Sequence, residues 1–255
     1  MYDGWLTFPP KDENAKIWRY MNLSKFISIL ETKALFFSSI EKLTEIDSHE
    51  GSITVKDKEK WDSLTSYLKE IHPPYEDPAK KRLESLNRNK SLVFANCWCM
   101  SDCDSDLMWH RYTANGWGLA IQSTVKRLKE SLSAEYKPLI SEVEYSDKYS
   151  GIDDHFIRPF LRKRPQFKDE HEIRAFISIL PLNEPILAEL GLKWEKPVGG
   201  KSVPVDLDRL IEKIYVLPKS KNNFIAEGKS ILDILKLTRF SDKVEISDLG
   251  KSPIS

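Results

Sequence analysis

The segment from Leu92 to Met100 constrains the fold more than any other, because it is apolar on both of the faces that a strand presents. Successive side chains of a strand point to opposite faces of its sheet, so a strand of this kind is covered on both sides. A second segment, Trp117–Ile121, also has the pattern of a buried strand. We therefore expect a central sheet with further elements packed against each face.

Weaker patterns along the chain predict the elements that surround these two strands. Strands are expected at 17–20, 34–39, 141–145 and 214–217, and helices at 22–30, 124–132, 153–163, 184–191, 207–213 and 229–237. Asn22 and Thr124 stand where helix N-caps are expected. The elements follow no regular strand–helix–strand rhythm, which favours an α+β fold with mixed or antiparallel central sheets and surrounding helices over a doubly wound parallel sheet.

The segment 52–90 is strongly charged and separates the strands on either side of it. Its apolar residues Trp61, Leu64 and Leu68 have helical spacing, and a stretch with three prolines, 73–78, ends that pattern. The chain shows no internal repeat and no low-complexity linker. We expect a single domain over residues 1–255, with a helical insertion at 52–90 and a tail at 240–255.

Composition narrows the functional classes. The 39 basic and 39 acidic residues balance to a formal net charge of +0, so only a local patch could attract nucleic acid or an anionic membrane. No apolar run approaches the length that spans a bilayer, and the first ten residues lack the features of a secretory signal. Three cysteines, an odd number, argue against a disulfide framework. We expect a cytoplasmic protein with reduced thiols and no membrane contact.

Two glutamates, Glu170 and Glu172, lie one residue apart at the start of an apolar strand, directly after a basic run, 158–168, that holds five cations and no acid. In a strand the two would share one face with Arg174. Carboxylates beside cations suit a site that binds a phosphate-bearing ligand and stabilises developing positive charge. The plain alternative is an outward-facing acidic pair, with Arg174 bonded to Glu172. The basic run is likewise typical of either a solvated helix end or a nucleic-acid patch.

The cysteines carry a weaker signal. Cys97, Cys99 and Cys103 could be drawn with His110 as a zinc site. Cys97 and Cys99 lie one residue apart inside a buried strand, however, where a free cysteine serves as a small apolar residue. We expect no metal site at these positions. The chain also lacks a glycine-rich phosphate loop.

Seven short motifs occur in the order found in a bacterial family known for a long time only as a domain of unknown function, and the chain resembles a member of it. The motifs are Arg19–Tyr20, Asp47–Glu50, Cys99–Ser101, Met108–Tyr112, Gly118–Ile121, Phe167–Arg174 and Glu212–Pro218. Each motif alone is weak, but seven in order over about residues 17–220 are fairly specific. The chain departs from the family at Ser48, where proline is commoner.

That motif order is similar to the order in the ADP-ribosyltransferase superfamily, many of whose members are toxins. There, an arginine or histidine on the first strand is followed by a serine or tyrosine element and then by a catalytic glutamate, often within Glu-x-Glu. The resemblance implies a split central sheet and NAD as co-substrate. It also implies that Glu172 is catalytic and that Glu170 serves the acceptor.

The resemblance further implies that five residues bind NAD. They are Arg19, Tyr20, Ser101, Trp109 and Tyr112. Arg19, with Tyr20 beside it, would hold the pyrophosphate or ribose, while Ser101 and the Trp109–Tyr112 face would frame the nicotinamide. Aromatic residues three apart on a helix are also typical of a core. Cys99–Ser101 replaces the Ser-Thr-Ser run of the superfamily, which argues against arginine as the acceptor.

The resemblance therefore implies a cytoplasmic enzyme, a bacterial toxin or antiphage effector, that transfers ADP-ribose from NAD to a nucleic acid or a protein. An antitoxin or chaperone would be its partner. Two alternatives stay open. One is a catalytically inactive binding or regulatory module of the same fold, and the other is a metal-dependent nuclease that uses Asp47, Glu50, Glu170 and Glu172.

Overall fold

The computed structural model describes residues 8–52, 55–71, 78–113, 118–136, 138–146, 157–179, 197–217, 235–236 and 238–250. The strands are β1 (Lys16–Met21), β2 (Ala34–Ser39), β3 (Val93–Met100), β4 (Leu119–Thr124), β5 (Leu139–Glu142), β6 (Glu144–Tyr145), β7 (Arg162–Lys163), β8 (Glu172–Ser178), β9 (Gly200–Pro204), β10 (Lys213–Val216) and β11 (Val244–Ile246). The α-helices are α1 (Leu23–Thr32), α2 (Ile40–Thr44), α3 (Val55–Ile71), α4 (Pro78–Lys90), α5 (Asp106–Tyr112), α6 (Val125–Ser131) and α8 (Leu207–Leu210). The 3-10 helices are η1 (Ala134–Tyr136), η2 (Arg158–Leu161), η3 (Pro165–Glu170), η4 (Ser241–Lys243) and η5 (Asp248–Gly250).

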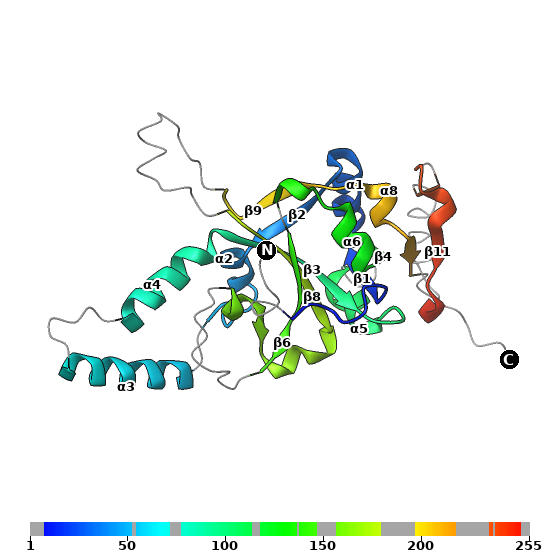
Figure 1. Cartoon of the computed structure of the whole chain (residues 1–255). Helices are drawn as coiled ribbons and strands as arrows, with labels where there is room; N and C mark the ends of the chain where they lie inside the picture. Colours follow the sequence, from blue (N-terminus) through cyan, green and yellow to red (C-terminus); the bar gives the residue numbers. More distant parts are fainter. Residues whose placement is uncertain are drawn as a thin grey trace, which may run out of the picture.

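A nine-stranded sheet forms the centre of the described structure (Figure 1). Its main path runs β11-β10-β4-β1-β3-β2-β9, and β8 connects β3 to β5. The β10–β11 ladder is parallel, while the other ladders described for this sheet are antiparallel. The predicted α+β class with a mixed, largely antiparallel sheet is therefore confirmed.

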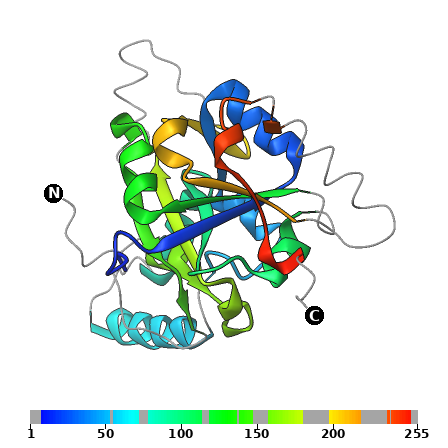
Figure 2. The ribbon, with the colours of Figure 1, turned by 90° about the vertical axis from the view of Figure 1, so that its right-hand side faces the viewer.

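The sheet forks at β3, because two different strands share one of its edges. β1 pairs with the end of β3 at Cys99 and Met100, and β2 pairs nearer its start, at Phe94 and Ala95. The other edge of β3 pairs with β8 along seven positions. β1 then continues beside β4 through the middle of the molecule (Figure 2). The edge of β3 around Cys97 thus lies between two diverging branches of the sheet.

Both faces of the sheet are covered, as the apolar segment from Leu92 to Met100 predicts. The main core lies on one face, where Ile17, Phe94 and Ile173 pack against α1, α6 and α8. The opposite face carries two smaller clusters. The α4 cluster consists of Ile40, Leu86, Val93, Ala95, Ile157, Phe160, Leu161 and Phe176. The α5 cluster consists of Trp18, Tyr20, Cys99, Met108, Trp109, Ala120 and Leu217.

The helices that border the sheet begin where their capping residues predict. The Asn22 side chain accepts a hydrogen bond from the backbone N–H of Lys25 at the start of α1. Thr124 does the same for Arg127 at the start of α6. Each cap satisfies a backbone donor that the first turn of a helix leaves without a partner.

The segment around 140–163 differs from its prediction. The expected strand at 141–145 is divided between β5 and β6, and residues 158–163 form the short η2 and the strand β7 in place of a helix. β7 pairs with β6, with Arg162 opposite Glu144 and Lys163 opposite Tyr145. A continuous helix could not supply this strand pairing, so tertiary contacts decide the conformation here.

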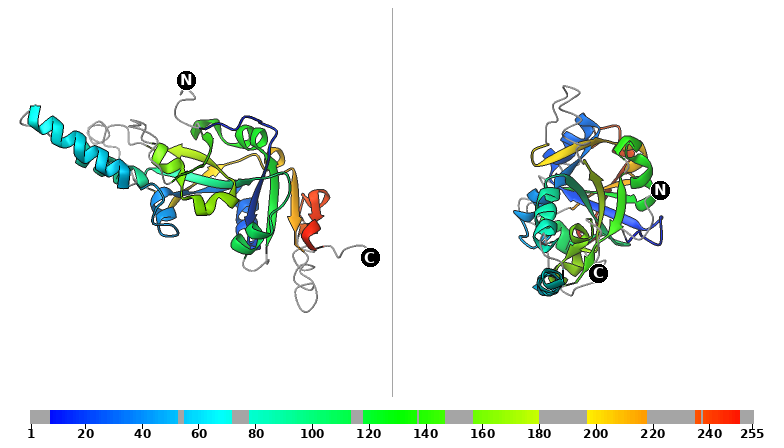
Figure 3. Two further views of the ribbon diagram at one scale, coloured as in Figure 1. Left: turned by 90° about the horizontal axis from the view of Figure 1, so that it is seen from below. Right: turned by 60° about the vertical axis from the view of Figure 1, so that its left-hand side comes forward.

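The segment 55–90 holds two helices, and they extend away from the sheet at the end where β3 begins (Figures 1 and 3). α4 begins at Pro78, and the first position of a helix is one where proline is tolerated. Leu86 anchors α4 to the sheet through the α4 cluster. The side chains of Trp61, Leu64 and Leu68 lie outside the described part, as do the predicted helix at 184–191 and most of that at 229–237.

Among the described helices, none is both long enough and apolar enough to cross a membrane. The helix expected at 207–213 is shorter than predicted, because α8 ends at Leu210 and β10 begins at Lys213. The strand expected at 214–217 is present as β10, beside β4.

Gly118 marks a close approach between β1 and the chain that enters β4. A Cβ added at Gly118 would lie 2.2 Å from the carbonyl oxygen of Met21 and 2.8 Å from the Cβ of Thr113. Both atoms are held by packed backbone, so the neighbours must shift. We predict that Gly118→Ala lowers the free energy of unfolding by about 1–3 kcal/mol, measured by urea denaturation. Ser28→Ala, on the exposed side of α1, serves as the control and should have little effect; equal stability of the two variants would contradict the prediction.

Candidate functional site

Charged side chains are buried together on the sheet face that carries the α4 and α5 clusters, and we call this set the Arg174 network. Its members are Glu50, Lys163, Glu170, Glu172 and Arg174. The Arg174 side chain is 1% exposed, and the three carboxylates are at most 6% exposed. Charges buried to this extent are stable only when they are paired and hydrogen-bonded.

Arg174 holds three separate chain segments together. Its Nε donates to Glu172 at 2.6 Å, and its two terminal nitrogens donate to the two oxygens of Glu50 at 2.7 and 3.0 Å. One terminal nitrogen also donates to the carbonyl oxygen of Phe160 at 2.8 Å. The planar guanidinium fork is suited to such paired contacts. Arg174 therefore fixes the turn at residues 45–51, the segment η2 and the strand β8 relative to one another.

Lys163 joins the two glutamates that the sequence singles out. Its Nζ lies 2.5 Å from Glu170 and 2.9 Å from Glu172, with Glu50 at 3.8 Å. Burial alone would lower the pKa of Lys163, but the charges of Glu172 and Glu170 outweigh burial and raise it. Lys163 is therefore a permanent cation between the two carboxylates.

Glu172 is held in its ionised form. Burial alone would raise the pKa of this carboxyl, but the charges of Arg174 and Lys163, with hydrogen bonds from Arg174 and the Cys97 thiol, lower it to about 2. Burial and the nearby Glu172 raise the pKa of Cys97, so its thiol keeps its proton at neutral pH. The backbone N–H of Glu172 donates to the phenol oxygen of Tyr145 at 2.6 Å. Glu172 is thus a fixed negative charge.

Glu170 lies beside Glu172, as predicted, but the two are not brought together by alternation within one strand. The strand begins at Glu172, and Glu170 ends η3, so the two do not share a face by strand alternation. His171 between them has a φ of 43°, in the left-handed region, which turns the chain. Glu170 contacts Lys163, the guanidinium of Arg111 and, at 3.5 Å, the hydroxyl of Tyr112.

An outer rim of Arg111, Arg164 and Phe167 lies beside the network. The side chains of Arg111 and Arg164 are 37% and 40% exposed, and their guanidinium carbons lie 5.7 and 5.2 Å from the Phe167 ring centroid. Arg164 donates to Asp47 at 2.9 Å. The second carboxylate oxygen of Asp47 and the Nε of Arg164 are buried without a hydrogen-bond partner. The rim is therefore cationic, aromatic and incompletely satisfied.

Arg19 leaves the sheet on the opposite face from Glu172. Trp18, Cys99 and Glu172 are paired across β1, β3 and β8, so they share one face. Arg19 alternates with Trp18 and Tyr20, both of which belong to the α5 cluster. Strand geometry therefore directs Arg19 towards the main-core face.

The guanidinium of Arg19 bonds within the fork of the sheet. It donates to the carbonyl oxygen of Cys97 at 2.6 Å and lies 5.9 Å from the Trp98 ring centroid. In the described part of the chain, no hydrogen bond or ion pair joins Arg19 to Glu170 or Glu172. The roles that the resemblance implies for Arg19 and Glu172 would require both side chains to reach one bound NAD, and no described contact joins them. β1, which carries Arg19, and β8, which carries Glu172, pair with opposite edges of β3.

The other residues expected to bind NAD have internal partners, and among them Tyr112 is the exposed one, with its hydroxyl bonded to Glu170. Tyr20 accepts a hydrogen bond from the Ser105 N–H at 2.8 Å, and the Trp109 indole, which is 0% exposed, donates to Asp104 at 2.9 Å. Ser101 donates to the Cys103 carbonyl at 2.7 Å. Trp109 has the role of a core residue, so its ring presents no open face. Tyr112 lies against Glu170, beside the outer rim.

The cysteines behave as the spacing within a buried strand predicts. Cys99 is buried, Cys97 is partly buried and Cys103 is exposed. Burial raises the pKa of Cys99 to about 12. Within the described ranges, no three side chains of His, Cys, Asp or Glu are grouped so that they could hold a metal ion.

The sequence did not assign Lys163 or Arg111 to the site, and it grouped Glu50 with Glu170 and Glu172 only in the nuclease alternative. Glu50 lies in a polar turn, Lys163 lies in a basic run, and Arg111 lies between the aromatic residues of α5. Their charges give no local signal of burial, because only the tertiary fold brings them to Glu170 and Glu172. Of the five residues of the Arg174 network, the Phe167–Arg174 motif contains only Glu170, Glu172 and Arg174.

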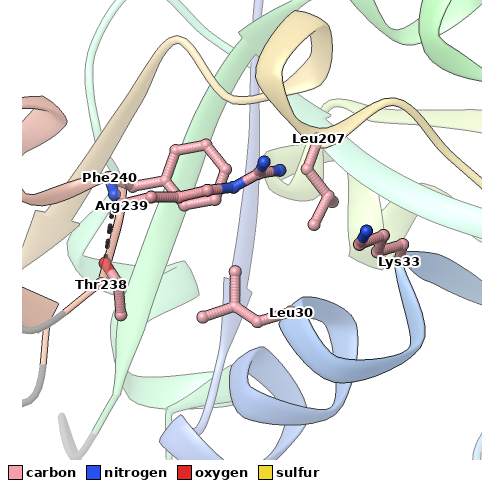
Figure 4. Close-up of a pocket in the computed structure, with 6 residues that line it drawn as sticks. All are labelled: Leu30, Lys33, Leu207, Thr238, Arg239 and Phe240. Atoms are coloured by element: carbon pink, nitrogen blue, oxygen red, sulfur yellow. Dashed lines mark hydrogen bonds between the residues drawn. The ribbon is translucent and has the colours of Figure 1, made fainter.

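A hollow of about 390 Å³ lies elsewhere, beside α1 and α8 (Figure 4). It is lined by Leu30, Lys33, Leu207, Thr238, Arg239 and Phe240. The Arg239 guanidinium lies 4.8 Å from the Phe240 ring centroid and pairs with Asp208 at 3.1 Å. None of the residues of the Arg174 network or the outer rim lines this hollow.

Comparison with family models, curated proteins and solved structures found no match for this chain.

The lowered pKa of Glu172 makes a prediction about acid stability. A carboxyl whose pKa falls from 4.5 to about 2 on folding stabilises the protein above pH 5, and this contribution is lost as the pH falls towards 2. The full contribution is roughly 3 kcal/mol. We predict that Glu172→Gln flattens the dependence of unfolding free energy on pH between 5 and 2, measured by urea denaturation. Glu135→Gln, at an exposed position outside the network, should keep the wild-type slope. An unchanged slope in Glu172→Gln would contradict the assignment.

Proposed function

We propose that the protein is an NAD-dependent ADP-ribosyltransferase that modifies a macromolecule, with its site where the Arg174 network meets the outer rim. One observation carries the proposal: Glu172, an ionised carboxylate, and Glu170 are held side by side on Lys163, next to a cationic and aromatic surface. In this proposal the protein acts as a bacterial toxin or antiphage effector in the cytoplasm, restrained by an antitoxin or chaperone.

An ionised carboxylate is the group that this chemistry requires. When the bond between nicotinamide and ribose breaks, its electron pair leaves with nicotinamide, and the ribose ring passes through an oxocarbenium-like state. A carboxylate bonded to the ribose 2′-hydroxyl stabilises that state more than the ground state. Glu172 fits this role because Arg174 and Lys163 keep it ionised at neutral pH.

The second glutamate would serve the acceptor. The acceptor's nucleophilic atom forms the new bond at the ribose C1′, and its proton passes to Glu170. Glu170 is the carboxylate nearer the rim, since it contacts Arg111 and Tyr112. An acceptor that approaches over the rim would therefore meet Glu170 before Glu172.

In this proposal the cations of the rim, and not Arg19, bind the pyrophosphate. Arg111 and Arg164 are partly exposed and flank Phe167, whereas Arg19 is bonded to Cys97 on the far side of β3. Guanidinium forks suit phosphate oxygens, and an aromatic surface suits a flat cationic ring. The fork of the sheet at β3 accords with the split sheet that the resemblance implies.

A direct test measures nicotinamide release from NAD and transfer of labelled ADP-ribose to cell lysate and to RNA. We predict that the wild type does both, and that Glu172→Gln lowers the rate about 10²–10³-fold because the charge that stabilises the transition state is lost. Glu142→Gln, on the neighbouring strand β5, is the matched control and should keep the wild-type rate. Absence of release and transfer in the wild type across varied acceptors would refute the proposal.

A second candidate is a catalytically inactive binding module of the same fold. It is favoured by the hydrogen bonds from Arg174, Lys163 and Cys97 that already occupy the Glu172 carboxylate, so that a ribose hydroxyl would have to displace one of them. Expression in bacteria separates the two candidates. A toxin slows growth and Glu172→Gln relieves the effect, whereas a binding module has no effect on growth that depends on Glu172.

A further inference from the structure

We propose that the surface formed by α4, η2 and η3 binds single-stranded nucleic acid, and that nucleic acid is therefore the acceptor class. The acceptor role rests on the proposed function, but the binding itself does not. Four features of the structure support it: segregation of charge, the packing of two basic segments on one cluster, a rim that can stack bases, and unsatisfied polar atoms within that rim.

Positive charge is concentrated in two segments of a chain whose formal net charge is +0. Residues 78–90, which form α4, hold five cations and one acid, and residues 158–168 hold five cations and no acid. The rest of the chain must carry a compensating negative excess. Lys163 and Arg164 are paired with Glu170, Glu172 and Asp47, so a polyanion would be attracted to the two segments through exposed cations such as Arg88 and Lys168.

The fold brings the two basic segments to one place, although nearly seventy residues separate them in sequence. Leu86 of α4 packs in the α4 cluster with Phe160 and Leu161, which lie within the second segment. Arg88 and Lys168 are exposed, one in each segment. The two segments are thus joined through one apolar cluster, and each carries an exposed cation beside it.

The rim offers surfaces on which unpaired bases can stack. Phe167 is partly buried, and Arg111, Lys163 and Arg164 each lie within 6 Å of its ring centroid, at 5.7, 5.0 and 5.2 Å. Aromatic rings and guanidinium planes are the groups on which proteins stack the bases of single strands. A duplex keeps its bases stacked on each other and cannot use such a surface without opening.

One oxygen of Asp47 and the Nε of Arg164, at the edge of the rim, are buried without a partner, so a base edge or a ribose hydroxyl can bond them only if the rim side chains move. The free oxygen of Asp47 needs a donor, and the Nε of Arg164 needs an acceptor. A base edge or a ribose hydroxyl presents both kinds of group close together. The guanidinium groups and the ring of the rim suit the π-face of an unpaired base, which an acidic side chain lacks, so we favour nucleic acid over an acidic protein partner.

The test is fluorescence anisotropy with a labelled fifteen-nucleotide single strand of mixed sequence, as RNA and as DNA, without NAD. The double variant Arg88→Glu/Lys168→Glu reverses one exposed charge in each basic segment. We expect it to weaken binding at least tenfold, and we expect wild-type affinity to fall steeply as salt is raised. The matched control is Lys25→Glu/Lys126→Glu, on α1 and α6, which changes the net charge equally and should alter affinity less than threefold.

A second variant, Phe167→Leu, keeps an apolar side chain but removes the ring. We expect it to weaken single-strand binding about tenfold while leaving the weaker binding of the matching duplex nearly unchanged. The proposal is overturned if the wild type binds neither strand at low salt, if both double variants weaken binding equally, or if poly-glutamate binds as tightly as the single strand. Binding without ADP-ribosyl transfer would refute the proposed function and leave this proposal standing. Transfer without binding would refute this proposal and leave the proposed function standing.

Discussion

The buried guanidinium of Arg174 is the interaction on which the rest of the site depends. It bonds Glu50 from the turn after α2, Glu172 on β8 and the carbonyl oxygen of Phe160 in η2. Removing any one partner would leave a charge buried without its counterpart, which typically costs about 3–5 kcal/mol. Because Lys163 and Arg174 neutralise the carboxylates around them, charge can be buried between the two apolar clusters of this face.

The sequence predicted the central strand and the helices that border the sheet better than it predicted the site. Period-two and helical patterns located the central strand and the capped helices, because those signals are local. In the described part of the helix expected near 153–163, only residues 158–161 are helical, as the 3-10 helix η2, since β6 recruits residues 162–163 as a strand. Glu170 was assigned to a strand because nothing local marks the left-handed turn at His171. The site could be seen only in part, because Glu50 and Lys163 reach it through tertiary packing alone.

The positions of the charged groups reassign the roles that the resemblance implied. Glu172 and Glu170 do lie together, but Arg19 lies on the other side of β3, bonded to Cys97. Arg111 and Arg164 stand where a phosphate-bearing ligand would approach the carboxylates. In the proposed function, the motif supplies Glu170 and Glu172, whereas Arg111 and Arg164 rather than Arg19 bind the anion. We propose that the two basic segments, which pack on the α4 cluster, extend this site into a surface that binds single-stranded nucleic acid.

The central claim is that Arg174 and Lys163 keep Glu172 ionised, and an NMR titration of the side-chain carboxyl carbons of glutamate tests it most directly. Comparison with Glu172→Gln assigns the signal. The account predicts that Glu172 shows no protonation step at or above about pH 3, because its pKa is about 2. A midpoint near the ordinary glutamate value of about 4.3 would contradict it, because Glu172 would then lack the strong pairing on which the proposed chemistry depends.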